Sequence, residues 1–408
     1  MEFLAFLRRN APFLTAGVLL TFVSSFGQTY LISVFAGEIR EAFGLSHGAW
    51  GAIYAAGTMV SAAVMIWAGA LTDVIRVRGL AAIVLGGLTF ACLAMAAIPA
   101  AWLLPVVIFL LRLCGQGMAS HIGTVAMARW FVARRGKALA IASLGFAAGE
   151  AFLPMIFVSL LPIVPSWRVL WVVAALIVLL ILPVLLRLLR GERTPQSIAE
   201  GSTATGMGAR HWARADVLRH WLFWVMVPAV LGPSAWGTAF FFQQVHLAEV
   251  KGWEHFELVA LFPVYTGVGI LSMIGSGWLI DRFGTGWLMP LAQLPVALAF
   301  FVLGAAESLW LAAVGIGLLA VTFGAGATLP GAFWAEFYGT RHLGAIKALA
   351  TAVMVLGSAI GPGITGALID LGISFPQQMV WIGIWFLAVF VVVSFGLARA
   401  RRALPAAA

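Results

Sequence analysis

The stretch "GALTDVIRVRG" at residues 69–79 places one aspartate and two arginines directly after a long apolar segment. The stretch "GWLIDRFG" at residues 277–284 repeats this arrangement, starting 208 positions further along the chain. Charged side chains where an apolar helix ends are typical of the boundary between a membrane and water. The two stretches therefore predict a membrane protein that contains a repeated unit.

The composition of the chain supports this prediction. Of its 408 residues, 62% are hydrophobic and 10% are charged, whereas soluble domains carry about 25% charged residues. Apolar runs of roughly 18 residues or more indicate membrane-spanning helices. They predict an all-α membrane protein with twelve spans in two six-helix bundles: 11–36, 48–72, 79–98, 102–130, 136–160, 167–190, 219–248, 255–280, 286–305, 308–335, 345–369 and 377–398. Cys92 and Cys114 lie within these runs, so we expect buried thiols and neither a disulfide, a metal site nor a cofactor.

The basic residues orient this map. With the N-terminus inside, Arg40, Arg168 and Lys251 fall in outer loops and Arg112 within a span, while the other Lys and Arg residues fall in cytoplasmic segments. This distribution follows the positive-inside rule. We therefore expect a cytoplasmic (inner or plasma) membrane protein with both termini in the cytoplasm. The net charge of +9 is explained by orientation, with no nucleic-acid partner.

A polar stretch divides the chain into two halves. Residues 191–210, "GERTPQSIAEGSTATGMGAR", have the Gly, Ser and Thr content of a flexible linker. We expect an N-terminal bundle over 1–190, a cytoplasmic linker over 191–218 and a C-terminal bundle over 219–408. A second repeat agrees with this division, because "KALAIA" at 137–142 matches "KALATA" at 347–352.

The chain resembles a major facilitator superfamily transporter along nearly its whole length. The two charged stretches are similar to that family's loop signature, Gly-x-Leu-x-Asp followed by basic residues and glycine. The resemblance implies secondary active transport of a small molecule by alternating access, rather than catalysis. It also implies that the charges latch the cytoplasmic side closed, whereas the alternative is that they only mark the membrane boundary. The residues of this expected gate are Asp73, Arg76, Arg78, Asp281 and Arg282.

Three ionisable residues lie within the predicted spans, where such groups are functional candidates. Arg112 in the fourth span and Glu150 in the fifth fall at similar depths, so they could form a pair. Arg112 is predicted to be an anion-binding or coupling charge and Glu150 its proton-titratable partner, or the two form a static ion pair between helices. His121, deeper in the fourth span, is a second candidate for proton coupling, or a histidine hydrogen-bonded within the bundle.

Polar residues in equivalent spans complete the predicted substrate site. Gln116 lies one turn from Arg112, Gln28 and Tyr30 lie in the first span, and Gln243 and His246 lie near the outer end of the seventh. A lone arginine in a region of low dielectric constant attracts carboxylates. We therefore expect a small organic anion as the substrate, protons as the coupling ion and a monomeric transporter in the lipid bilayer.

One segment suggests a subfamily. "ARWFVARRGKALAIASLGFAAG" at 128–149 resembles the junction of spans four and five in monocarboxylate and oxalate/formate-type transporters. The eighth span lacks the intramembrane Arg or Asp typical of those carriers, so Arg112 would have to bind the carboxylate. The alternative is a proton-coupled exporter of drugs or amphipathic metabolites, although Gly149 is followed by Glu150 and not by the proline usual in that group.

Overall fold

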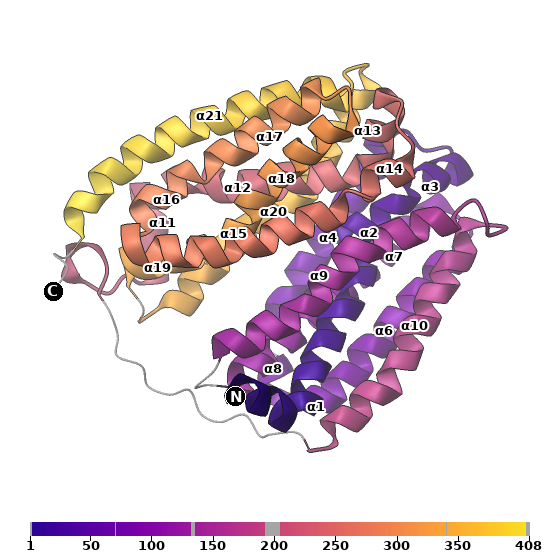
Figure 1. Cartoon of the computed structure of the whole chain (residues 1–408), viewed down its shortest axis with the longest axis horizontal. Helices are drawn as coiled ribbons and strands as arrows, with labels where there is room; N and C mark the ends of the chain where they lie inside the picture. The colour runs from indigo at the N-terminus through magenta and orange to yellow at the C-terminus, as the bar shows by residue number, and fades with distance from the viewer. Residues whose placement is uncertain (1, 70, 132–134, 192–204, 340, 405–408) are drawn as a thin grey trace. The chain divides into compact units, whose positions relative to one another are not determined.

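The computed structural model describes residues 2–69, 71–131, 135–191, 205–339 and 341–404 (Figure 1). Over these residues the secondary structure is helical, and the chain divides into two compact units, Met1–Ala199 and Glu200–Ala408. The structure has 12 helical segments that are long and apolar enough to cross a membrane. The predicted all-α class and number of spans are thus confirmed.

Unit 1 contains the first six spans. Its uninterrupted long helices are α1 (Glu2–Val23), α4 (His47–Ala68), α6 (Val77–Ala97), α9 (Arg135–Leu160) and α10 (Trp167–Leu188). The fourth span is composite, with α7 (Leu104–Leu111), a π-helical segment η4 (Arg112–Ala119) and α8 (Ser120–Trp130). The short helix α5 (Leu71–Val74) lies in the first charged stretch.

The first span departs from the single helix over 11–36 that the sequence predicts. After Val23 the chain passes through η1 (Ser24–Gly27), α2 (Thr29–Ile32) and η2 (Ser33–Phe35) into α3 (Ala36–Phe43). Gln28 interrupts the helix because its backbone is extended, with φ −86° and ψ 150°. Irregular backbone at membrane depth must be enclosed by protein, and residues 24–35 are indeed buried.

Unit 2 contains the other six spans. Its uninterrupted long helices are α12 (Trp221–Phe242), α15 (Phe262–Phe283), α20 (Leu343–Asp370) and α21 (Phe375–Ala400). The ninth span comprises α16 (Thr285–Leu291) and α17 (Gln293–Ala305), and the tenth comprises α18 (Leu309–Gly326) and α19 (Leu329–Tyr338). The short helices α11 (Arg214–Arg219), α13 (Gln244–Lys251) and α14 (His255–Val259) flank α12 and α15.

The two units share one packing scheme. In unit 1, α1 packs along α9, α4 along α7, and α6 along α10; in unit 2 the equivalent helices pair as α12 with α20, α15 with α18, and α17 with α21. Glycine permits the closest of these approaches, because a Cβ atom at Gly145 would overlap Val18 O and one at Gly361 would overlap Ala235 O. The repeat seen in the sequence therefore extends to helix packing.

Part of the predicted linker belongs to unit 2. Residues 192–204 lie outside the described residues, but residues 205–213 pack against the end of α19. Trp212 and Met207 are buried, the Trp212 indole donates to Met207 O at 3.1 Å, and Trp212 N donates to Tyr338 O at 3.4 Å. The apolar area of these two side chains explains why this segment folds, although its glycine content resembles that of a flexible linker.

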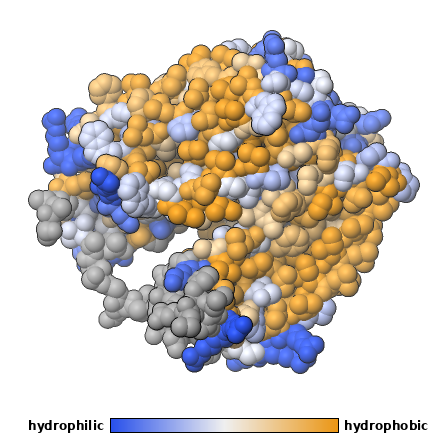
Figure 2. Space-filling model, in the orientation of Figure 1, coloured by the Kyte–Doolittle hydropathy of each residue, from blue (hydrophilic) through white to orange (hydrophobic). Residues whose placement is uncertain are grey.

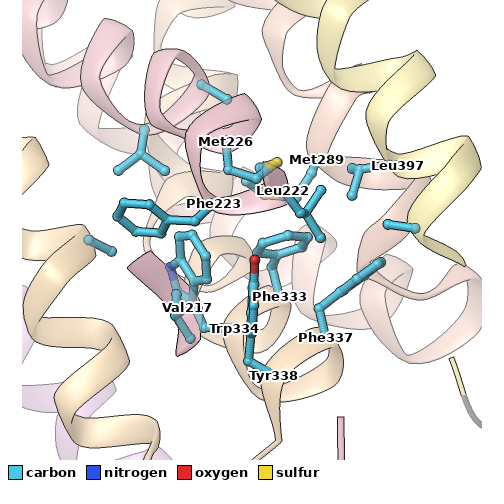
Figure 3. Close-up of a cluster of buried hydrophobic side chains, with 14 of the residues drawn as sticks. Val217, Leu222, Phe223, Met226, Met289, Phe333, Trp334, Phe337, Tyr338 and Leu397 are labelled. Atoms are coloured by element: carbon cyan, nitrogen blue, oxygen red, sulfur yellow. The ribbon is translucent and has the colours of Figure 1, made fainter. Parts of the chain in front are cut away.

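The docked segment covers an apolar cluster at what we call the linker end of unit 2, where α12 begins and α21 ends. Helices α11, α12, α16, α19 and α21 contribute to it (Figure 3). The rings of Phe333 and Phe337 are stacked with their centroids 4.6 Å apart. The labelled members are Val217, Leu222, Phe223, Met226, Met289, Phe333, Trp334, Phe337, Tyr338 and Leu397.

Two of the basic residues predicted for the outer loops bind helix ends. Arg168 Nη1 donates to Ala96 O at 3.0 Å and to Ile98 O at 2.7 Å, at the end of α6. Lys251 Nζ donates to Gly304 O at 2.7 Å, in the last turn of α17. Since the last carbonyls of a helix lack partners and carry partial negative charge, both cations stabilise equivalent helices of the two units.

His220 links the docked segment to α19, and its ionisation makes the docking of this segment depend on pH. Its Nδ1 lies 3.2 Å from the Tyr338 hydroxyl, and its ring centroid lies 4.6 Å from that of Trp212. Burial, and then the charge of Arg210, lower the pKa of His220 below its usual range. When the segment detaches, His220 regains an ordinary pKa of about 6.5 and binds a proton more readily.

Docking of residues 205–213 should therefore be at full strength above about pH 6.5 and weaken as the pH falls towards the lowered pKa of His220. Hydrogen exchange of peptides over 205–213, corrected for the intrinsic pH dependence of exchange, measures this. Protection should decrease between about pH 7.5 and pH 5.5 in the wild-type protein. It should not change in the His220→Gln variant, and equal protection of the wild-type segment at both pH values would contradict the prediction.

Candidate functional site

Arg112 is the most deeply buried charged side chain of the candidate site. It is 2% exposed and lies at the first position of η4. Its Nη1 donates to Gly27 O at 3.2 Å and to Thr29 Oγ1 at 3.3 Å, and its guanidinium lies 5.4 Å from the centre of the Tyr54 ring. The Thr29 hydroxyl also hydrogen-bonds with the Tyr54 hydroxyl. All of these partners are neutral, and Arg112 Nε has no partner among the described residues.

The interruption of the first span makes this arrangement possible. The extended backbone at Gln28 leaves Gly27 O outside a regular helix, and that oxygen can accept from Arg112. At the same point the chain meets η4, because a Cβ atom on Gly115 would lie 2.6 Å from Gly27 Cα and one on Gly27 would overlap Leu111 O. π-Helical turns are frequent at functional sites, and this one brings the backbones of the first and fourth spans together.

The pair of Arg112 with Glu150 is not formed. The hydrogen-bond and ring partners of Arg112 are Gly27, Thr29 and Tyr54. Glu150 instead lies near Tyr30. The sequence predicts the pair because the two residues lie at similar depths along two straight helices. Depth does not show on which side of its helix each residue lies, and the π-helical segment η4 changes that side in the fourth span.

Tyr30 belongs to a second polar group in unit 1. Its hydroxyl donates to Ser25 Oγ at 2.8 Å, and a Cβ atom on Gly149 would lie 3.5 Å from the same hydroxyl. Glu150, which follows Gly149 in α9, is partly buried. The broken first span therefore contacts Arg112 of the fourth span and the Gly149–Glu150 region of the fifth.

Gln28 and Gln116 lie close in the chain to Arg112 or to its partners, and their side-chain amides are uncommitted. Gln28 lies in the interruption between the two Arg112 partners Gly27 and Thr29, and the backbone nitrogen of Gln116 approaches Gly27. Neither side-chain amide hydrogen-bonds with a described residue, and Gln28 is 8% exposed. They are the free donors and acceptors nearest in the chain to Arg112 and its partners.

The polar candidates of unit 2 have other roles in its packing. Gln243 lies where α12 gives way to α13, and its Nε2 donates to Thr365 Oγ1 at 3.1 Å. Gln378 Nε2 donates to Thr365 O at 3.1 Å, so one network connects the seventh, eleventh and twelfth spans. His246 Nε2 accepts from Phe375 N, 3.4 Å away, at the start of α21. Their participation in a substrate site remains a prediction.

His121 lies near the first charged stretch and away from the interruption at Gln28. A Cβ atom on Gly69, at the end of α4, would be 3.5 Å from His121 Nε2. The side chain of Asp73 lies outside the part of the chain that the structure describes, and Arg76 and Arg78 are exposed. The latch role of these residues stays a prediction.

The second charged stretch is held by a residue that the sequence analysis missed. Asp281 and Arg282 are exposed, whereas Glu336 at the end of α19 accepts from Thr285 N at 2.9 Å and from Thr285 Oγ1 at 2.6 Å. Gly284, with φ +71°, makes the turn between α15 and α16. Glu336 thus fixes the start of α16, directly after the end of α15 that carries Asp281. No local motif indicates this contact, because the partners are 51 residues apart.

Thr29 and Tyr54 are the other site residues that sequence reasoning missed. Thr29 lies inside the polar stretch that contains Gln28 and Tyr30, and Tyr54 is one of only 4 tyrosines in the chain. A tyrosine in the small-residue span "GAIYAAG" at 51–57 is the signal that could have drawn attention to it.

Comparison with known proteins agrees with this architecture. Residues 17–286 match the model of the Major Facilitator Superfamily. A solved bacterial homolog of the human lysosomal transporter Spinster, inward-facing and occupied, gives a TM-score of 0.68 at 17% identity, over 95% of this chain and 92% of that chain. Its unoccupied form gives 0.64 at 16% identity, over 96% and 93%. A mutant of the nucleoside transporter NupG gives 0.70 at 12% identity, over 95% and 99%. No curated protein sequence gives a significant match.

The protein belongs to the major facilitator superfamily. It is therefore an integral membrane protein with a transporter fold, and its relatives are transporters of small molecules rather than enzymes.

The Gly27–Gly115 contact predicts a sharp difference between two glycine substitutions. Gly27→Ala should destabilise the protein by about 1–3 kcal/mol, because the added methyl group overlaps the backbone of the fourth span. Gly86→Ala is the matched control, since a Cβ atom there has no neighbour within 4 Å. Thermal unfolding in detergent should show a lower Tm for Gly27→Ala only; equal Tm values would mean that the two spans separate without cost.

Proposed function

We propose that this protein is a secondary active transporter that moves a small organic anion, carboxylate-like in chemistry, by alternating access and together with protons. The observation that supports this proposal is the buried Arg112, whose partners Gly27, Thr29 and Tyr54 are all neutral. The resemblance of residues 128–149 to monocarboxylate and oxalate/formate-type transporters is consistent with the same substrate class.

The electrostatics of Arg112 favour an anionic ligand. Removing a guanidinium from water costs several kcal/mol, and neutral hydrogen-bond partners offset only part of that cost. A carboxylate can accept two parallel hydrogen bonds from the guanidinium and neutralise its charge. Binding would replace the 3.2 Å and 3.3 Å contacts to Gly27 O and Thr29 Oγ1. The free energy gained by pairing the charge is the driving force for anion binding.

The neighbouring polar groups would define the rest of the ligand. The uncommitted amides of Gln28 and Gln116 can donate to and accept from hydroxyl, amide or second carboxyl groups. Tyr54 and Thr29 are positioning residues, because their hydroxyl pair and the Tyr54 ring fix the guanidinium beside the interruption in the first span. We propose that Gln243 and His246 of unit 2 also contact the substrate. They lie at and just after the break in the seventh span, which is equivalent to the break at Gln28 in the first span.

Proton coupling is assigned to Glu150, with His121 as the second candidate. Glu150 is partly buried and lies near Tyr30 of the broken first span. Since the Arg112–Glu150 pair is not formed, Glu150 can change its protonation state without leaving Arg112 without a partner. The proposed gate remains the two charged stretches. A lower transport turnover of an Asp281→Asn variant at unchanged substrate affinity would support that role.

The substrate class is tested by ligand-dependent thermal stability of the purified protein. Carboxylates should raise the Tm, and Arg112→Gln should weaken their binding by roughly 10- to 150-fold, since a hydrogen bond to a charged group contributes about 1.5–3 kcal/mol. Arg187→Gln, which removes an exposed arginine of the same unit, is the control and should bind as the wild type does. Stabilisation by lipophilic cations alone would overturn the proposal and favour the exporter alternative.

Coupling is tested in proteoliposomes with an imposed pH gradient. Glu150→Gln should still exchange substrate across the membrane but should no longer accumulate it against a gradient, because the glutamine cannot carry the proton. Counterflow and pH-driven uptake separate these two activities. Undiminished pH-driven accumulation by Glu150→Gln would remove Glu150 from the mechanism.

A further inference from the structure

Three exposed arginine–tryptophan contacts lie at the linker end of unit 2. The closest is that of Arg401, whose guanidinium lies 3.6 Å from the centre of the Trp287 ring. In the other two, the guanidinium lies 5.5 Å from the ring centre, with Arg399 over Trp221 and Arg282 over Trp278. All three tryptophans lie within two residues of a helix start or five of a helix end. Tryptophan and arginine at such positions are typical of the lipid headgroup region.

The packing around Arg401 fixes the position of its side chain. The absence of a side chain at Gly286 makes room for it, because a Cβ atom there would lie 2.7 Å from Arg401 Cδ. Arg401 Nε donates to Leu397 O at 3.3 Å, and this bond helps to hold the guanidinium over Trp287. Arg401 Nη1 is buried and has no partner among the described residues. The side chain is therefore oriented, while part of its hydrogen-bonding capacity is unused.

Acidic side chains do not neutralise this end of unit 2. Among the described residues they are Asp216, Asp281 and Glu336. Asp216 accepts from Ala213 N, and Glu336 accepts from Thr285. Asp281 lies in the last turn of α15, directly before Arg282. The positive charge of Arg401 thus lacks an acidic partner within the described residues, while Arg399 and Arg402 lie on the same helical end.

An apolar surface continues from Arg401 along the helices. The Trp287 ring is 59% exposed, and Leu291, one turn further along α16, is 47% exposed. Phe395 on the neighbouring α21 is 75% exposed. Figure 2 shows the hydrophobic outer surface of this unit, with hydrophilic side chains gathered where α21 ends. A ligand bound at Arg401 would therefore meet a charged site at one end and an apolar surface suited to acyl chains beyond it.

We propose that Arg401 and Trp287 form a binding site for the phosphate group of an anionic phospholipid, whose acyl chains lie along Leu291 and Phe395. The phosphate accepts hydrogen bonds from the unused face of the guanidinium after a small side-chain movement. Arg399 adds attraction for the negative headgroup. The site fixes the end of α21 to α16 through a lipid, and it is independent of the substrate proposed for Arg112.

Native mass spectrometry and thermal unfolding of the purified full-length protein test the site. Dioleoylphosphatidylglycerol should bind and raise the Tm more than dioleoylphosphatidylcholine does. Arg401→Gln should weaken binding of the anionic lipid roughly fivefold, the effect of losing one basic residue near a membrane surface. Arg402→Gln is the matched control on the adjacent, exposed position, and it should retain nearly wild-type binding.

A second variant separates lipid binding from damage to α21. Trp287→Leu keeps Arg401 and its bond to Leu397 O but removes the stacking surface, and it should also lose preference for the anionic lipid. Equal binding by Arg401→Gln and Arg402→Gln would overturn the proposal. So would equal stabilisation by phosphatidylcholine, or stabilisation by inorganic phosphate that matches that of phosphatidylglycerol, because the site would then recognise no anionic lipid.

Discussion

The guanidinium of Arg112 lies inside a bundle of apolar helices, where an isolated charge costs several kcal/mol even after relaxation. Much of the local structure of unit 1 accommodates this charge. The first span breaks at Gln28 and presents Gly27 O, the fourth span forms a π-helix, and the second span contributes Tyr54. Each of these partners is neutral, so the charge is hydrogen-bonded without being cancelled. That combination allows a buried cation to persist and still to attract an anion.

The two units share a packing scheme but differ in their polar chemistry. Both have a break in their first span, at Gln28 and at Gln243. In unit 1 the break leaves the amides of Gln28 and Gln116 uncommitted, whereas in unit 2 Gln243 bonds to Thr365. The two halves of this duplicated fold thus share their helix pairs, while the buried arginine with neutral partners is found in unit 1. Unit 2 uses its buried amides to connect three helices.

The ends of unit 2 are organised by polar contacts over long separations in the chain. Glu336 fixes the start of α16, Lys251 binds the end of α17, and Trp212 brings the segment before α11 onto α19. These contacts satisfy backbone groups that helix ends leave free. The arginines that lie over Trp221, Trp278 and Trp287 take no part in these contacts, so they can take part in the anionic lipid site that we propose.

The sequence by itself determined the class of fold, the number of spans and the repeat, because hydrophobicity, helix length and charge placement are local properties that the bilayer constrains strongly. It also identified Arg112, since a charge within an apolar run is visible without coordinates. Only the tertiary structure decided which groups surround that charge. The partners Gly27, Thr29 and Tyr54 come from other spans, and a π-helical turn rotates the fourth span relative to the straight helix assumed from spacing. Only the tertiary structure likewise shows that Glu150 lies near Tyr30. Contacts between helices depend on the side of the helix that each residue occupies and on where helices are interrupted, and no local sequence pattern encodes either.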